Sequence, residues 1–264
     1  MALHFCSFSS GSSGNCYLVR SETTALLVDV GISGRKIIDN LGKSLTRMED
    51  LAAILITHEH SDHVKSLRTM TKKVPHIRTY ANQGTWEQVQ DLVKEEQRAV
   101  FETGTTFVIG DIKVKPFPIC HDAVEPVGFS FYDGSKQISI VTDTGCLNNE
   151  IFEEIREADL LILEANHDVE MLRIGRYPWF LKQRILGEKG HLSNVDAAST
   201  ICRLLAETKK YRHVLLAHLS RENNFPEMAY QTIKNLLEES DYFIDQNVCL
   251  NVIARDEMSA LYTL

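Results

Sequence analysis

The stretch ILITHEHSDHV, residues 54–64, sets a run of apolar residues directly before a dense group of titratable side chains. Three histidines, an aspartate and a glutamate fall within positions 58–63. Burying one unpaired ionisable group is costly, and burying several is worse unless something binds them together. A metal ion meets that requirement. The stretch therefore predicts a metal site at the end of a buried strand.

The spacing inside this stretch indicates more than one ion. His58 and His60 are two residues apart at a strand end, so their side chains project to the same side. Asp62 and His63 follow as the chain turns into a helix, for which Ser61 is the expected cap. Four donors so close in sequence cannot all reach one ion, but they can serve two ions that lie near each other.

Further polar residues end apolar strands elsewhere in the chain. They are Asp29, His121, Asp143, Glu164 and His218. In layered α/β proteins, sites gather where strands end, because the loops there face a common edge. We expect His121, Asp143 and His218 to supply the remaining ligands, with the two carboxylate oxygens of Asp143 able to bridge two metals.

The order of predicted elements indicates one α/β domain over residues 1–264. Strands are predicted at 3–8, 15–20, 24–31, 51–58, 105–110, 111–119, 127–133, 136–143, 159–166, 213–220 and 247–254. Helices are predicted at 33–45, 61–73, 148–158, 193–208 and 225–240. No repeat or linker interrupts this order. Strands with helices on both outer sides suggest two packed sheets between helical layers.

Composition narrows the class of protein. Of 264 residues, 44% are hydrophobic and 24% charged, which is ordinary for a globular protein. The net charge of −8 argues against coating nucleic acid through bulk charge, although local basic patches remain compatible with it. The six cysteines show no CxxC pair, so reduced thiols and a cytoplasmic location are expected. No signal peptide or membrane span is apparent, so no membrane partner is expected.

The complete motif set resembles the metallo-β-lactamase superfamily, whose signature is HxHxDH. The resemblance implies a four-layer αββα sandwich with a dinuclear site at one edge. It implies that one ion is held by His58, His60 and His121. The other is held by Asp62, His63 and His218. Asp143 would bridge the two ions, and Asp29 would support the site from behind the ligands.

Other segments look like the YycJ (WalJ) branch of this superfamily, which implies exonuclease activity on DNA. They are SFSSGSSGNCYLV (7–19), EANHD (164–168), GHLSN (190–194) and LSRENN (219–224). Part of the pattern also resembles the tRNA 3′-end-processing nucleases, where a Glu–His dyad corresponds to Glu164 and His191. The loop after His218 departs from those enzymes, and their long tRNA-gripping arm has no counterpart here.

The resulting hypothesis is a phosphodiesterase with two divalent cations. A hydroxide bridging the ions attacks phosphorus while Asp62 orients it, and His191, held by Glu164, protonates or stabilises the leaving oxygen. Nitrogen and carboxylate ligands without thiolate suit Zn²⁺ or Mn²⁺. For His191, an ordinary exposed loop histidine is the competing interpretation.

Several residues are candidate contacts to a nucleic acid substrate, with DNA favoured. Arg173 and Arg176 belong to segment 173–190, where basic residues alternate with aromatic ones. The alternative is a surface helix whose aromatic side chains are core. The remaining candidates are Ser12, Ser13, Asn15, His167 and Asn223. A helix-start role competes for His167, and a plain hairpin turn competes for residues 9–15.

Three other functions stay open at this point. The same metal site would suit a thioester, lactone or amide hydrolase, or a nuclease that processes tRNA or other RNA. A metal-dependent scaffold without catalysis is the third. The sequence leaves strand polarity, the metal, and the oligomeric state undetermined.

Overall fold

The computed structural model describes residues 2–264, and the chain divides into two compact units. The first unit contains residues up to Pro118, together with Ala123–Lys136 and Ala254–Leu264. The second contains Ile119–Asp122 and Gln137–Ile253. The expectation of a single domain over 1–264 stays a prediction.

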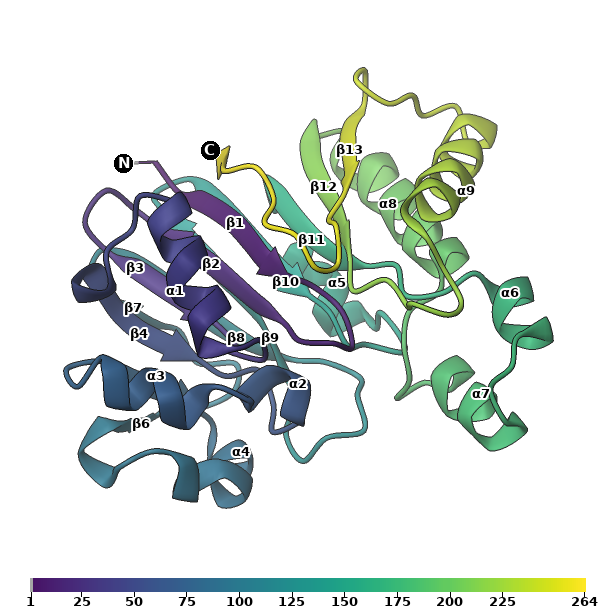
Figure 1. Ribbon diagram of the computed structural model, residues 1–264. Coiled ribbons are helices and arrows are strands. Elements are labelled where there is room, and N and C mark those ends of the chain that lie inside the picture. The colour runs from purple at the N-terminus through teal and green to yellow at the C-terminus, as the bar shows by residue number, and fades with distance from the viewer. Residues whose placement is uncertain (1) are drawn as a thin grey trace. The chain divides into compact units, whose positions relative to one another are not determined.

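The first unit is built on a mixed sheet with strand order β14-β1-β2-β3-β4-β5-β6 (Figure 1). Its strands are β1 (His4–Ser9), β2 (Cys16–Arg20), β3 (Ala25–Val28), β4 (Leu51–Leu55), β5 (Arg78–Ala81), β6 (Arg98–Val100) and β14 (Tyr262–Thr263). Strands β1 to β3 are antiparallel, whereas β3 to β6 run parallel. Of the parallel strands, β3 and β4 are short apolar runs that are largely buried, as the inner strands of a parallel sheet require.

Four α-helices and a second, antiparallel set of strands complete the first unit. The helices are α1 (Gly34–Lys43), α2 (Ser61–Val64), α3 (Leu67–Lys73) and α4 (Gln83–Val89). Short 3₁₀ turns occur at Met48–Asp50, Gln90–Leu92 and Glu95–Gln97. The antiparallel strands are β7 (Phe107–Ile109), β8 (Ile112–Pro118) and β9 (Val127–Asp133). Phe101, from the loop after β6, packs on Phe107 and Phe129 and joins the two sets of strands.

The predicted helix over 61–73 is wrong as a single element. The structure breaks it into α2 and α3, because the Ser66 backbone N–H donates to the Val30 carbonyl instead of continuing the helix. Ser61 is the first helical residue rather than the cap, and His60 occupies the N-cap position. The break therefore separates the titratable residues 58–63, which follow β4, from helix α3.

The second unit is a parallel sheet with strand order β13-β12-β11-β10. Its strands are β10 (Lys136–Val141), β11 (Leu160–Glu164), β12 (Arg212–Ala217) and β13 (Val248–Val252). Its helices are α5 (Asn149–Ile155), α6 (Val169–Ile174), α7 (Trp179–Leu186), α8 (Asn194–Thr208) and α9 (Pro226–Glu239). In Figure 1, α8 and α9 lie together, whereas α6 and α7 stand apart from them.

Local signals in the sequence explain where these helices begin. The Ser193 hydroxyl accepts from the Asp196 backbone N–H and contacts the Asp196 carboxylate, as the predicted cap of α8 requires. Pro226 opens α9, where a missing N–H costs nothing. These caps fix the loops before α8 and α9, and those loops carry His191 and Asn223.

Candidate metal centre

Three predicted site residues leave their strands in an unusual backbone conformation. Asp29 directly follows β3, His218 directly follows β12, and Asp143 lies two residues beyond β10. Their φ angles are 59°, 55° and 59°, in the left-handed region that non-glycine residues seldom adopt. Such conformations cost free energy and concentrate at functional sites. The sharp turn ends each strand and carries the side chain off the sheet.

In the first unit, the buried Asp29 carboxylate anchors the HEHSDH stretch. Its Oδ2 lies 2.7 Å from His63 Nδ1 and accepts from the Thr57 hydroxyl at 2.9 Å. Its Oδ1 accepts from the Thr57 backbone N–H at 3.0 Å. Thr57 Oγ1 also lies 3.0 Å from His58 Nδ1. Because Nδ1 of His58 and Nδ1 of His63 take part in these contacts, Nε2 is the ring nitrogen of each that suits a metal.

The opposite ring nitrogens in this unit face other donor atoms. His58 Nε2 lies 3.1 Å from His60 Nδ1, and His63 Nε2 lies 3.7 Å from a carboxylate oxygen of Asp62. His58 and His63 are fully buried, whereas Asp62 and His60 are partly exposed. Imidazoles and a carboxylate gathered in this way form a donor set that fits a divalent cation.

Asn15 lies inside this cluster rather than at the surface. Its side-chain amide is 3.1 Å from His63 Nε2, and its backbone N–H donates to the Asp62 carbonyl at 2.8 Å. Gly31 fits against the same carbonyl, because a Cβ there would lie 1.6 Å from the Asp62 oxygen. Asn15 therefore positions the 62–63 turn. Ser12 and Ser13 of the same loop are exposed, and Ser13 bonds to Asp256.

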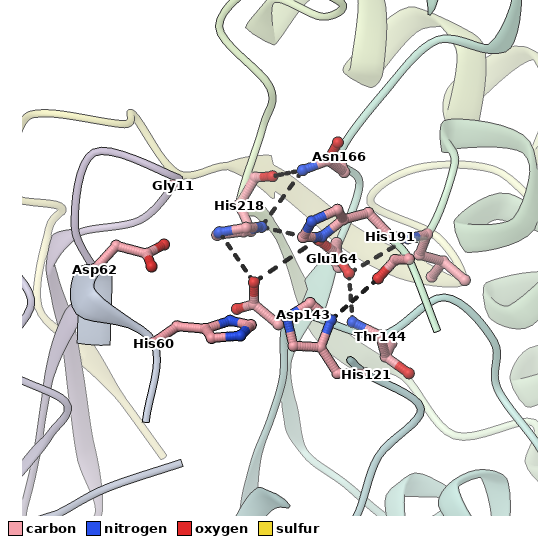
Figure 2. Close-up of polar contacts among 12 residues, drawn as sticks. Gly11, His60, Asp62, His121, Asp143, Thr144, Glu164, Asn166, His191 and His218 are labelled. Atoms are coloured by element: carbon pink, nitrogen blue, oxygen red, sulfur yellow. Dashed lines mark hydrogen bonds and ion pairs between the residues drawn. The ribbon is translucent and has the colours of Figure 1, made fainter. Parts of the chain in front are cut away.

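In the second unit, the buried Glu164 carboxylate connects four groups (Figure 2). Its Oε1 lies 2.8 Å from Nδ1 of His191 and 2.8 Å from Nδ1 of His218. Its Oε2 accepts from the backbone N–H groups of Thr144 and Leu192, at 2.7 and 3.3 Å. The predicted Glu164–His191 contact is present, and the same carboxylate also orients His218.

The charges of this pair depend on each other. Burial alone would raise the pKa of Glu164, but the charge and hydrogen bond of His191 and the bond from His218 lower it to about 2. Burial would likewise lower the pKa of His191, but the Glu164 carboxylate and then Asp143 raise it to about 9. At neutral pH, His191 is therefore a protonated imidazolium that has a proton to donate.

Asp143 and His121 complete the second unit's donor groups. Asp143 Oδ1 lies 3.3 Å from His218 Nε2, and ligand atoms of Asp143, Glu164, His191 and His218 all lie within 4.8 Å of one another. His121 Nδ1 lies 3.3 Å from the Gly190 carbonyl. Burial lowers the pKa of His121, which keeps it neutral as a ligand must be. This set also fits a divalent cation.

Some residues of the site carry no signal in the sequence that we used. Thr57 and Asn166 contact predicted ligand histidines: the Thr57 hydroxyl lies 3.0 Å from His58 Nδ1, and the Asn166 side chain donates to the His218 carbonyl at 2.9 Å. Thr144 contributes only a backbone N–H. Thr57 directly precedes His58, and Asn166 lies two residues after Glu164. Their positions next to predicted site residues are the signal from which they could have been predicted. A backbone donor such as Thr144 has no residue-type signal.

The remaining predicted substrate contacts occupy different settings. Arg173 is exposed and pairs with Glu170 at 2.8 Å, and Arg176 is exposed. His167 and Asn223 are buried. Neither ring nitrogen of His167, nor the Asn223 Oδ1, has a hydrogen-bond partner within residues 2–264. Burial lowers the pKa of His167 to about 4, so it is neutral at physiological pH. Their contacts to substrate stay predictions.

Comparison with known proteins assigns the family. Residues 24–217 match the model of the β-lactamase superfamily domain. The chain belongs to this superfamily. The exodeoxyribonuclease YycJ of Bacillus anthracis is 38% identical, with 93% of each chain covered. The exodeoxyribonuclease WalJ of Streptococcus pneumoniae is 43% identical over 88% of this chain and 87% of that protein. The predicted relationship to the YycJ (WalJ) branch is therefore confirmed.

A solved structure of the same superfamily confirms the fold class. The metallo-β-lactamase fold protein YhfI from Bacillus subtilis aligns over 100% of both chains, with a TM-score of 0.75 and 19% identity. The α/β sandwich predicted from the sequence is thus correct. As a member of this superfamily, the protein is a metal-dependent hydrolase.

Within residues 2–264, no helix combines the length and apolar character needed to cross a bilayer.

Proposed function

We propose that the protein is a dinuclear metal-dependent phosphodiesterase that degrades DNA as an exonuclease. The names of the YycJ and WalJ relatives support this substrate class. The observation that carries the proposal is the contact between the buried Glu164 and the partly exposed His191, because a cationic imidazole beside the proposed ligand Asp143 suits the departure of a sugar oxygen. A thioester, by contrast, loses a thiolate, which has less need of a proton donor at this position.

The proposed metal ligands follow the superfamily pattern. In that pattern, His58, His60 and His121 would hold one cation, Asp62, His63 and His218 would hold the other, and Asp143 would be shared between them. The donor chemistry within each unit supports this assignment, because carboxylates, a hydroxyl or a carbonyl oxygen engage Nδ1 of the buried histidines. Nitrogen and carboxylate donors without thiolate suit Zn²⁺ or Mn²⁺.

Two divalent cations held by these residues would lower the pKa of a water toward neutrality and neutralise charge on the phosphate. Asp62 would orient this water by accepting a hydrogen bond from it. Having lost one proton to solvent, the water oxygen would form the bond to phosphorus as the bond from phosphorus to the leaving sugar oxygen breaks, and His191 would give its proton to that oxygen. Glu164 keeps the ring of His191 oriented and charged. The products are a nucleotide and a shortened strand.

A digestion series tests the proposal. Single- and double-stranded DNA and RNA, labelled at the 5′ or the 3′ end, are incubated with Mn²⁺ or Zn²⁺, with the Asp62→Ala variant as control for contaminating nucleases. We expect release of nucleotides from DNA ends, abolished by chelator and absent in the variant. Rapid turnover of thioesters, lactones or amides with none on DNA would reject the proposal, and preference for RNA would reject its substrate.

A further inference from the structure

One segment of the second unit starts directly after Glu164 and ends directly before His191, the proposed proton donor. Residues 165–190 leave the end of β11, form α6 and α7, and return to the loop before α8. At the base of this segment, the 2.8 Å contact between Glu164 and His191 brings its two ends together. Gly190, its last residue, lies 3.3 Å from the ring of His121. We call residues 165–190 the α6–α7 lobe (Figure 1).

The tip of the α6–α7 lobe exposes large apolar side chains. Ile174 is 84% exposed, Trp179 66% and Phe180 72%. The sequence allowed these rings to be core residues of a surface helix, and the exposure excludes that interpretation. Clustered exposed aromatic groups on a soluble unit mark a binding surface. By contrast, Trp86, the other tryptophan of the chain, is 5% exposed.

Basic residues lie close to these rings in the sequence. Arg176 and Lys189 are exposed, while Arg173 and Arg184 are exposed and paired with Glu170 and Asp122. The lobe carries five basic residues and three acidic ones, Asp168, Glu170 and Glu188, whereas the whole chain carries a net charge of −8. The lobe is therefore a local basic surface on an acidic protein. Its charge is complementary to a polyanion and not to the rest of the surface.

We propose that the α6–α7 lobe binds a single-stranded segment of the nucleic acid substrate. Bases stack on Trp179 and Phe180, and Arg176 and Lys189 contact phosphates. A single strand is the occupant because only unpaired bases offer their faces to the rings. The proposal deepens the proposed function and rests on it for the substrate class. The lobe would hold the strand whose end is cut beside His191.

The test compares two matched double variants of the full-length protein. Trp179→Ala with Phe180→Ala removes the exposed rings. Leu45→Ala with Val108→Ala is the control, because these side chains are 86% and 64% exposed in the first unit. Binding of a fluorescent oligothymidine is followed by anisotropy in the presence of chelator, so that turnover plays no part. We expect affinity to fall about tenfold or more for the lobe variant only, because each stacking ring contributes substantially.

Two further readouts separate this proposal from the proposed function. Oligothymidine should quench the emission of Trp179 in the wild type and in the control, and the quenching should vanish with Trp179→Ala, since Trp86 is buried. Hydrolysis of bis(p-nitrophenyl) phosphate, which is too short to span the lobe and the metal centre, should be unchanged in both variants.

The outcomes are distinguishable. Unchanged oligothymidine affinity in the lobe variant, or quenching by phosphatidylglycerol vesicles and not by the oligonucleotide, overturns the lobe proposal even if DNA is degraded. Ring-dependent binding of oligothymidine without hydrolysis of any nucleic acid supports the lobe proposal and overturns the proposed function.

Discussion

The Glu164 carboxylate accepts hydrogen bonds from two histidines that have different proposed roles. It holds His218, a proposed ligand, and His191, the proposed proton donor, through one oxygen atom. Because the carboxylate is fully buried, its charge acts on both rings with little screening by water. One side chain thereby couples the orientation of a ligand to the protonation of an acid.

Changing His191→Ala should separate substrates by their leaving groups. Hydrolysis of DNA should fall by about 10²- to 10⁴-fold, because the sugar oxygen leaves without a proton. Hydrolysis of bis(p-nitrophenyl) phosphate should change far less, because p-nitrophenolate is a stable anion. Steady-state rates on both substrates check this, with metal content measured for each sample. Equal losses on both substrates would show that His191 acts only on the structure of the site.

The buried, neutral His167 predicts a pH dependence of stability. Its pKa is lowered from 6.5 to about 4 by burial, so the unfolded chain binds a proton that the folded chain excludes between these values. The free energy of unfolding is therefore highest above pH 6.5, where His167 is neutral in both the folded and the unfolded chain. It decreases as the pH falls toward 4, because protonation then favours the unfolded chain. Relative to His167→Phe, the wild type should lose on the order of 3 kcal/mol over that range.

Urea unfolding of both proteins at several pH values measures the difference. The exposed His76, changed to Gln, is the control and should leave the pH dependence as in the wild type. Parallel pH curves for wild type and His167→Phe would contradict a depressed pKa.

At the scale of elements, strand ends were predictable and tertiary contacts were not. The apolar runs ending in Asp29, Glu164 and His218 located β3, β11 and β12, because burial on both faces demands such runs. The break between α2 and α3 was missed, because it depends on a backbone bond from Ser66 to Val30, far away in sequence.

The candidate site shows the same division. Motif spacing predicted candidate donor groups in both units. It did not reveal that Glu164 holds His218, 54 positions later, or that Asn15 contacts His63. Such contacts depend on which loops the folded strands bring together, and a single sequence does not encode that in residue spacing.

The β3–α1 loop should be intolerant of a side chain at Gly31. A Cβ there would lie 1.6 Å from the Asp62 carbonyl oxygen, so Gly31→Ala must displace the 62–63 turn. We expect destabilisation by about 2 kcal/mol or more together with loss of bound metal. Gly42→Ala in α1 is the control, because its Cβ meets nothing within 4 Å. That variant should be more stable by about 0.5–1 kcal/mol. Urea unfolding and metal analysis check both, and normal metal content in Gly31→Ala would contradict the role of the loop.

At the scale of the whole molecule, each unit buries carboxylates and imidazoles, among them Asp29 and His63 in the first unit and Glu164 and His218 in the second. A cation that binds only the folded chain adds its binding free energy to stability. The superfamily's dependence on metal should therefore appear in thermal unfolding as well as in activity.

Removal of metal should lower the melting temperature by about 5 °C or more. This corresponds to about 2.7 kcal/mol for a cation at a hundred times its dissociation constant. Differential scanning calorimetry before and after chelation, followed by Mn²⁺ or Zn²⁺ addition, measures the shift and its reversal. The Asp143→Asn variant should show a smaller shift. A melting temperature insensitive to chelator would argue against the proposed ligands.

The closed base of the α6–α7 lobe has a consequence for how such enzymes diversify. Glu164 is held by β11 and by the backbone of Leu192, and the Asn166 N–H bonds to the Leu192 carbonyl. These bonds clamp the two chain ends together, so the length and composition of the intervening segment can change without altering the pair that they carry. Grafting a different segment between these ends is thus a direct route to new substrate preferences on an unchanged chemical apparatus.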